Sequence, residues 1–257
     1  MQWTIIFKKE MLEYWRNFSW IWVPVVFILL AIMDPLTTYY MPIILDTVGG
    51  LPEGTSIEMP DIAAADALMM SLQEFSMFGV LIIVLLTMGT ISGERKSGVV
   101  ELVLVKPVRY SHYISSKWAA KITLILTAYL IGLLASWYYV NLLFGDITIL
   151  AFIQTFLFYG LWLILVVTIT IFYNTLLKTP GLIGALSIGT ILSMSAINSI
   201  FSHKLTWFPN SLSSHIRQLL HTGEIPTALW GTSFVTVTFI IALLFLSFFT
   251  FNKKELA

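Results

Sequence analysis

Two acidic residues in this sequence of 257 residues, Glu94 and Glu101, have a spacing that could serve acid–base chemistry. Glu94 and Glu101 are seven positions apart, so a helix would place them on one face. Paired carboxylates can work as a general acid and a general base, but no basic or metal-binding partner accompanies this pair. A membrane-embedded enzyme is therefore a disfavoured alternative, and we expect no catalytic residue in the chain.

Histidines offer the next chemistry, because His203, His215 and His221 fall in one segment between residues 202 and 228. His215 and His221 are six positions apart, whereas a helix presents two histidines to one metal at a spacing of four. Solvated or interfacial histidines fit this spacing better, and we expect no metal site.

Signatures for nucleotide and thiol chemistry are missing from the sequence. It contains no glycine-rich loop followed by Lys and Ser or Thr, so it has no usual means of binding a triphosphate. It also lacks cysteine, which removes disulfides, zinc–thiolate sites and thiol nucleophiles. The net charge of zero gives no reason to expect a nucleic-acid partner. No cofactor is therefore expected in this chain itself.

The composition indicates that lipid surrounds most of the chain. Hydrophobic residues make up 58% and charged residues 11%, against about 25% charged residues in soluble domains. The mean hydropathy is +0.87. Runs of about 20 apolar residues predict six transmembrane helices in one domain, at residues 18–40, 72–91, 118–144, 149–176, 182–201 and 229–251.

Positive charges predict the orientation. With the N-terminus inside, twelve of the fourteen Lys and Arg residues are cytoplasmic, and only Lys204 and Arg217 are outside. An odd number of spanning helices would destroy this bias. We therefore predict an all-α integral membrane protein with both termini in the cytoplasm. Residues 1–17 carry apolar side chains at helical spacing and predict an amphipathic helix in the cytoplasmic interface.

An apolar segment with charged flanks lies between the second and third predicted spans, at residues 93–109. Six Val and Leu residues surround Glu101, and Pro107 ends the segment. The segment is too short to cross a membrane, so we predict a short surface helix, with a strand as the alternative given by its valines. Its apolar side chains need lipid or another protein as a partner.

This segment resembles the stretch after the second helix of ABC-2 type permeases, the membrane subunits of bacterial ABC exporters. The shared pattern is an acidic–basic pair, a glycine, a Glu-Leu pair in an apolar run, a proline and a later lysine, here Glu94-Arg95, Gly98, Glu101-Leu102, Pro107 and Lys117. The length, helix count and amphipathic N-terminal segment of the chain also agree with that family.

The resemblance implies that segment 94–109 contains the coupling helix that docks on a separate ATPase. The residues it assigns to docking are Glu94, Arg95, Lys96, Glu101, Leu102, Leu104, Pro107 and Arg109. It further implies two ATPase subunits that bind ATP and Mg, and a second permease, identical or homologous, that completes the path. The implied location is a bacterial cell membrane with the chain in contact with lipid.

Polar residues within or near the spans are further candidates. Asp34, Asn174 and Asn198 are candidates for lining the path or its gate, although a position in the outer interface is favoured for Asp34 and such amides more commonly bond helix to helix. Between spans five and six, Leu212, Ile216 and Leu219 recur at helical spacing and resemble the short, partly re-entrant helices of the family.

Two other functions stay open. Secondary transporters usually carry ionisable residues at mid-membrane, and these spans hold few. A non-transporting membrane anchor or sensor partner would have the same composition. The substrate cannot be read from the sequence, because related permeases handle drugs, peptides, lipids, ions and glycans.

Overall fold

The computed structural model describes residues 2–48, 62–98 and 109–255. Within these ranges the chain is all helical and has no strand. Six helical stretches are long and apolar enough to cross a membrane, namely Ser19–Leu45, Ala64–Lys96, Tyr110–Leu143, Ile149–Leu176, Pro180–Phe201 and Thr227–Asn252. The prediction of an all-α protein with six candidate transmembrane helices is therefore confirmed.

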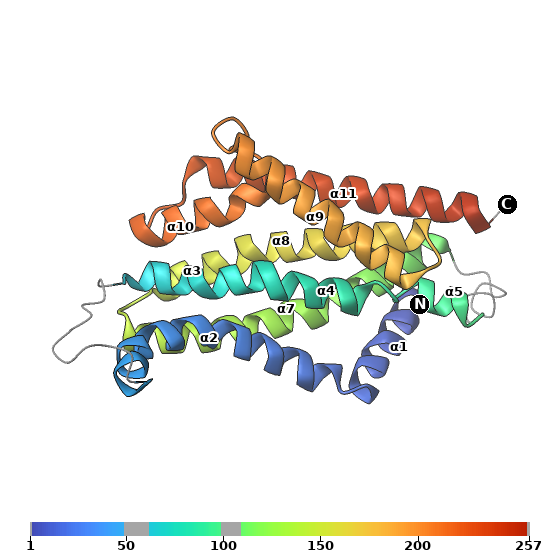
Figure 1. The fold of residues 1–257 in the computed structure, drawn as a ribbon. Helices are drawn as coiled ribbons and strands as arrows, with labels where there is room; N and C mark the ends of the chain where they lie inside the picture. Colours follow the sequence, from blue (N-terminus) through green and yellow to red (C-terminus); the bar gives the residue numbers. More distant parts are fainter. Residues whose placement is uncertain (1, 49–61, 99–108, 256–257) are drawn as a thin grey trace.

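The long helices form an elongated bundle (Figure 1). Both chain termini lie at one end of the bundle together with the short helix α5 (Ser92–Lys96), and we call this the termini end. Helix α10 (Leu212–Thr222) lies at the opposite end, which we call the α10 end. The two short helices that lie between successive spans, α5 and α10, are therefore at opposite ends of the bundle.

Helix α8 (Ile149–Leu176) is the most enclosed element. In its most apolar stretch 72% of the residues are buried, compared with 22% in α9 (Pro180–Phe201) and 22% in α11 (Thr227–Glu255). It packs against α11, α9 and α7 (Tyr110–Leu143), and α7 packs in turn against α2 (Ser19–Val48). The outer helices keep large apolar side chains exposed, which suits contact with lipid or a second subunit.

Local sequence signals explain several helix ends. The hydroxyl of Thr148 accepts a hydrogen bond from the amide of Ala151 and so caps the start of α8. Pro180 occupies the first turn of α9, where its missing N–H costs nothing. Gly223 ends α10 with a φ of 74°, a conformation that glycine adopts without strain.

Helix α1 (Gln2–Arg16) precedes the first span and meets it at a sharp corner, where Phe18 has a φ of 55°. Its exposed side includes Ile5 and Trp15, each 67% exposed, whereas Glu10 and Tyr14 are buried against the bundle. The helix packs on α7 and α2. One face of α1 is therefore available to lipid while its buried face carries polar groups.

The helices around spans one to three are longer than their apolar runs. The first helix continues to Val48, the second begins at Ala64 with α3 (Ala64–Glu74), and the third begins at Tyr110. The extensions were not predicted as parts of the spans because they contain charged and polar residues such as Asp66 and His112, which interrupt an apolar run without interrupting a helix. A π-helical turn (Phe75–Gly79) joins α3 to α4 (Val80–Thr87).

Helices α2 and α7 approach each other closely at Gly132. A Cβ atom added at Gly132 would lie 2.8 Å from the carbonyl oxygen of Phe27 and 3.0 Å from its carbonyl carbon. Beside this contact the ring of Phe27 stacks on Phe75 at a centroid separation of 5.3 Å, and Phe75 meets Tyr129 edge to face at 5.5 Å. Glycine is therefore needed at this crossing.

Candidate functional site

Helix α5 has only five residues and follows the second span at the termini end of the bundle (Figure 1). A turn at Met88–Ile91 separates it from α4, so the first backbone amides of α5 do not continue the hydrogen bonding of α4. Three of its residues, Ser92, Glu94 and Arg95, bond to other elements of the bundle. These contacts define the candidate coupling junction.

The side chain of Asn174 on α8 holds the start of α5. Its Oδ1 accepts hydrogen bonds from the amides of Ile91 and Ser92, both at 3.2 Å. Its Nδ2 donates to the carbonyls of Thr87 and Thr170, at 3.1 and 2.9 Å. All four hydrogen-bonding positions of the amide are used, and the residue is fully buried. Asn174 therefore lies in a joint between helices rather than on a cavity surface.

The carboxylate of Glu94 ties α5 to α7 and α1. Its Oε2 accepts a 2.6 Å hydrogen bond from the hydroxyl of Tyr113, and its Oε1 lies 3.0 Å from the ammonium of Lys117. Lys9 on α1 also bonds to Glu94. Burial lowers the pKa of Lys9, but Glu94 and Glu10 more than offset this and hold that pKa above its usual value. Lys9 therefore stays charged.

Lys117 is the buried centre of this cluster. Its ammonium lies 2.7 Å from Oε1 of Glu10, and the side chains are 2% and 5% exposed. The carboxylates of Glu10, Glu13 and Glu94 lie within 4.8 Å of one another, a separation at which three acids can hold a metal ion. Here the ammonium of Lys9 contacts all three, so their negative charge is already compensated.

Arg95 connects α5 to the last helix of the bundle. Its guanidinium donates to the carbonyl of Thr175 at 3.4 Å and lies 4.5 Å from the centre of the Phe251 ring. Lys96 and Arg109 are exposed. The remaining predicted docking residues fall outside the described ranges; these are Glu101, Leu102, Leu104 and Pro107.

The arrangement suits the transmission of force rather than chemistry. Hydrogen bonds and ion pairs join α5 to α1, α7 and α8, and Arg95 lies over the Phe251 ring of α11, so a displacement of α5 must move or break contacts on four helices. Packed interiors resist continuous deformation. A push on this segment would therefore reach the spanning helices directly.

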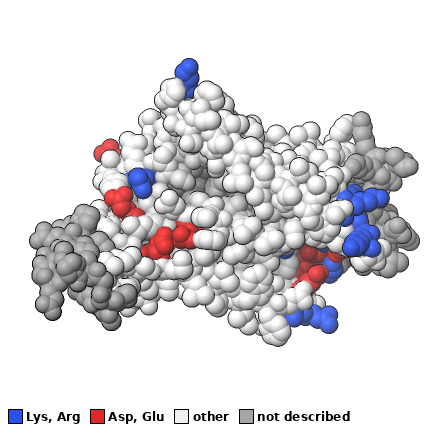
Figure 2. All heavy atoms as spheres, viewed as in Figure 1, with Lys and Arg blue, Asp and Glu red and all other residues white. Residues whose placement is uncertain are grey.

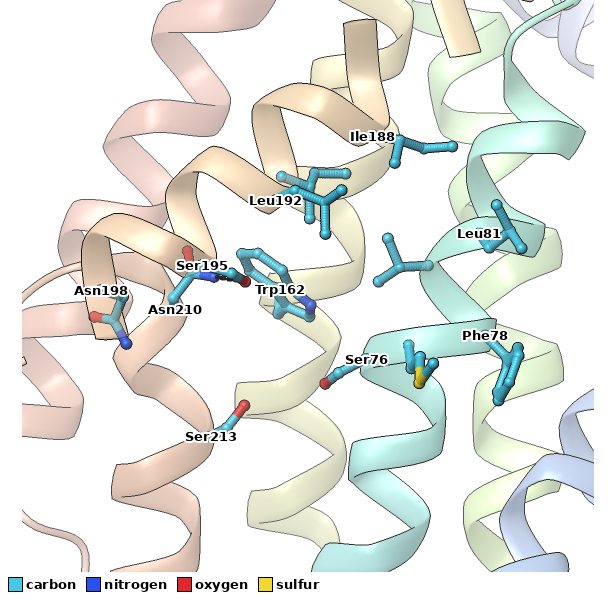
Figure 3. Close-up of a pocket in the computed structure, with 13 residues that line it drawn as sticks. Ser76, Phe78, Leu81, Trp162, Ile188, Leu192, Ser195, Asn198, Asn210 and Ser213 are labelled. Carbon is cyan, nitrogen blue, oxygen red and sulfur yellow. Dashed lines mark hydrogen bonds between the residues drawn. The ribbon is translucent and has the colours of Figure 1, made fainter. Parts of the chain in front are cut away.

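The other two candidate path residues lie elsewhere. Asp34 on α2 lies close to Glu74 on α3, a neighbour that the sequence did not indicate. Asn198 on α9 lines a lateral cavity of about 380 Å³ with Trp162 of α8 and Ser213 of α10 (Figure 3). The structure therefore does not bring Asp34, Asn174 and Asn198 together.

Several residues of the junction were missed by sequence reasoning. Glu10 contacts Lys117, which is 107 positions away in the sequence. Tyr113 contacts Glu94, which is 19 positions away. The signal available in the sequence was Glu10 itself, a charged residue in the predicted amphipathic N-terminal helix. Nothing in the sequence pairs it with Lys117.

Comparisons with known proteins agree with this architecture. A family model described as "ABC-2 family transporter protein" matches residues 4–256. A Bacillus subtilis (strain 168) protein described as "Uncharacterized transmembrane protein YxlG" is 30% identical over 251 residues, which is 97% of each chain. The match covers nearly all of the sequence, including the junction and the six spans. The chain therefore belongs to the ABC-2 family of transporter proteins.

Proposed function

We propose that this chain, a permease component by family, forms half of the export path of an ATP-driven transporter. A separate ATPase would bind ATP and Mg and dock on segment 94–109. The observation that carries the proposal is the fixation of α5 to four other helices, because a docking segment can transmit motion only through firm contacts.

The distribution of charge supports a cytoplasmic position for the termini end. In the view of Figure 2, Lys and Arg side chains gather at the end that holds α5, whereas acidic side chains are frequent toward the α10 end. Positive charge accumulates on the cytoplasmic side of membrane proteins. With this orientation α5 would face the ATPase, and η2 (Pro209–Ser211) and α10 would cover the outer end of the path.

The proposed coupling runs through the junction. Closure of two ATPase subunits would displace segment 94–109, and α5 would pull on α8 through Asn174 and on α1 and α7 through Glu94. A cavity of about 570 Å³ beside the junction gives α5 and α1 room to shift. The shift would open the path outward.

A pair of permeases is the proposed assembly. Helices α2, α9 and α11 expose many large apolar side chains, including Leu29, Leu192 and Phe234. Gly181 and Gly189 leave open space on α9, which would let another helix approach closely. The partner would be a second copy or a homologous permease, in a bacterial cell membrane.

The test is co-expression with the ATPase encoded beside this chain's gene, followed by purification and reconstitution in nanodiscs. We expect the ATPase to co-purify and its hydrolysis rate to rise at least severalfold over that of the isolated ATPase. Absence of both would refute coupling. Substrate movement driven by an ion gradient without ATP would favour a secondary transporter, and stimulation without any transport would favour a sensor partner.

A further inference from the structure

The lateral cavity lies between helices of a single subunit. It is bordered by the π-helical turn and α4, by Trp162 of α8, by α9 and by the η2–α10 segment (Figure 3). Its volume of about 380 Å³ is in the range of small-molecule sites. Met77 and Leu192 are 67% and 63% exposed, so the cavity opens onto the outer surface of the bundle.

One part of the cavity is apolar. Leu81 projects from α4, Ile188 and Leu192 from α9, and the Trp162 ring from α8 (Figure 3). An alkyl chain placed among these side chains would be removed from water, at a gain of about 0.8 kcal/mol for each buried methylene group in general. This wall therefore suits a hydrocarbon chain.

The other part is polar but uncharged. Asn198, Asn210, Ser195 and Ser213 line it, and the described lining contains no charged residue. Nδ2 of Asn210 donates to Oγ of Ser195 at 3.0 Å. Among the described residues, the buried Oδ1 of Asn210 has no hydrogen-bond partner. A buried acceptor without a donor is costly, so this atom favours a ligand that supplies one.

A charged head group does not fit this chemistry. The described groups near the polar part are amides and hydroxyls, and the positive charge of Arg217 belongs to a neighbouring cavity of about 290 Å³ that shares only Ser76 and Ser213. A hydroxyl both donates and accepts hydrogen bonds, so it satisfies an asparagine amide in either of its two orientations. The polar part therefore suits a hydroxyl group.

We propose that this cavity binds an uncharged amphipathic molecule, with its alkyl chain against Leu81, Ile188 and Leu192 and a hydroxyl-bearing head group at Asn210. Alcohols and monoacylglycerols are the chemical class. Binding of this molecule stands on the cavity alone, and transport of the bound molecule would rest on the proposed function.

The experiment uses the full chain in nanodiscs, without any ATPase. The probe is a monoacylglycerol with a ten-carbon chain that carries a diazirine, and labelled peptides are mapped by mass spectrometry after irradiation. We expect adducts at cavity residues such as Leu192 and Trp162, and at least a fivefold loss of that labelling with excess monodecanoylglycerol. Decanoate, which is anionic, should compete at least fivefold less well.

Two variants locate the head group. Asn210→Ala should weaken competition by monodecanoylglycerol about fivefold, the size expected for one hydrogen bond, and should leave competition by decane unchanged. Ser193→Ala is the matched control on α9, because that hydroxyl donates to the carbonyl of Gly189 in its own helix and is not among the residues that line the cavity. Ser193→Ala should leave competition by monodecanoylglycerol and by decane unchanged.

Three results would overturn the inference. The first is labelling of lipid-facing residues such as Leu157 and Phe234 to the same extent as the cavity, without competition. The second is equal competition by decanoate and monodecanoylglycerol, and the third is an unchanged response in Asn210→Ala. Saturable labelling combined with a failure of any ATPase to couple would instead uphold the site and overturn only the proposed function.

Discussion

Nζ of Lys117 lies 2.7 Å from Oε1 of Glu10, although the two residues are 107 positions apart. This ion pair is almost fully enclosed, and it joins the helix before the first span to the third span. The same ammonium contacts Glu94 at 3.0 Å, so the pair also reaches the start of the segment between spans two and three. A single buried lysine therefore connects the three elements proposed to receive the motion of an ATPase.

Removal of the lysine alone should destabilise the protein strongly. Lys117→Met leaves the buried carboxylate of Glu10 without its closest cation, and breaking a buried pair costs about 3–5 kcal/mol. We expect a clearly lower unfolding temperature in detergent, measured by intrinsic fluorescence. The double variant Glu10→Leu with Lys117→Met should recover part of the loss, because neither charge of this pair is then left buried without its partner. A single variant as stable as the wild type would show that this pair is not a structural centre.

The Asn174 amide should determine whether α5 stays folded onto the bundle. Asn174→Leu leaves the amides of Ile91 and Ser92 without an acceptor, at about 1–3 kcal/mol for each buried donor. We expect trypsin to cut after Arg95 or Lys96 at least several times faster in this variant. Asn198→Leu is the control, because Asn198 accepts a bond from Ser211 at the α10 end. Equal cleavage rates in the Asn174→Leu and Asn198→Leu variants would contradict the proposal that Asn174 holds α5 on the bundle.

The orientation can be tested directly because the chain contains no cysteine. Single cysteines at Lys8, Lys178 and Lys204 should react differently with a membrane-impermeant maleimide applied to intact cells. We expect Lys204→Cys to react, and Lys8→Cys and Lys178→Cys to react only after permeabilisation. Lys8→Cys and Lys178→Cys are cytoplasmic if the positive-charge rule holds, so the intact membrane shields them from the maleimide. Labelling of Lys178→Cys in intact cells would place the α8–α9 connection outside.

The number of spans could be predicted from the sequence because a run of about 20 apolar residues is typical of a membrane-spanning helix and rare elsewhere. The ends of the helices could not, since helices α3 and α7 begin with residues that bond inside the protein, such as Ser71 to Ser136 and Tyr113 to Glu94. Pairings across more than 80 positions, including Asn174 with Ile91, leave no local pattern. Membership of the family suggested where the junction lies, but not that Glu10 and Tyr113 complete it.

The crossing of α2 and α7 should tolerate no side chain at Gly132. A methyl group there meets the Phe27 backbone at 2.8 Å, and backbone cannot move aside as a side chain can. Overpacking of this kind costs about 1–3 kcal/mol, so Gly132→Ala should lower the unfolding temperature. Gly160→Ala on α8 is the control, since its nearest neighbour would lie at an ordinary 3.5 Å, and it should be neutral or slightly stabilising. Equal changes of the unfolding temperature in Gly132→Ala and Gly160→Ala would refute the close approach of α2 and α7 at Gly132.

A substitution at the exposed Lys96 of α5 can test docking on the ATPase without disturbing the fold. Arg95 is bonded to Thr175 and Phe251, so its reversal would disturb the fold itself, whereas Lys96 is exposed. Lys96→Glu should therefore keep the unfolding temperature of the wild type and reduce stimulation of the co-purified ATPase by at least half. Lys178→Glu changes the same charge in the loop between α8 and α9, where we expect weaker contact with the ATPase, so stimulation should be retained. Full stimulation in Lys96→Glu, with transport also unchanged, would remove α5 from the docking surface and leave the junction a structural role alone.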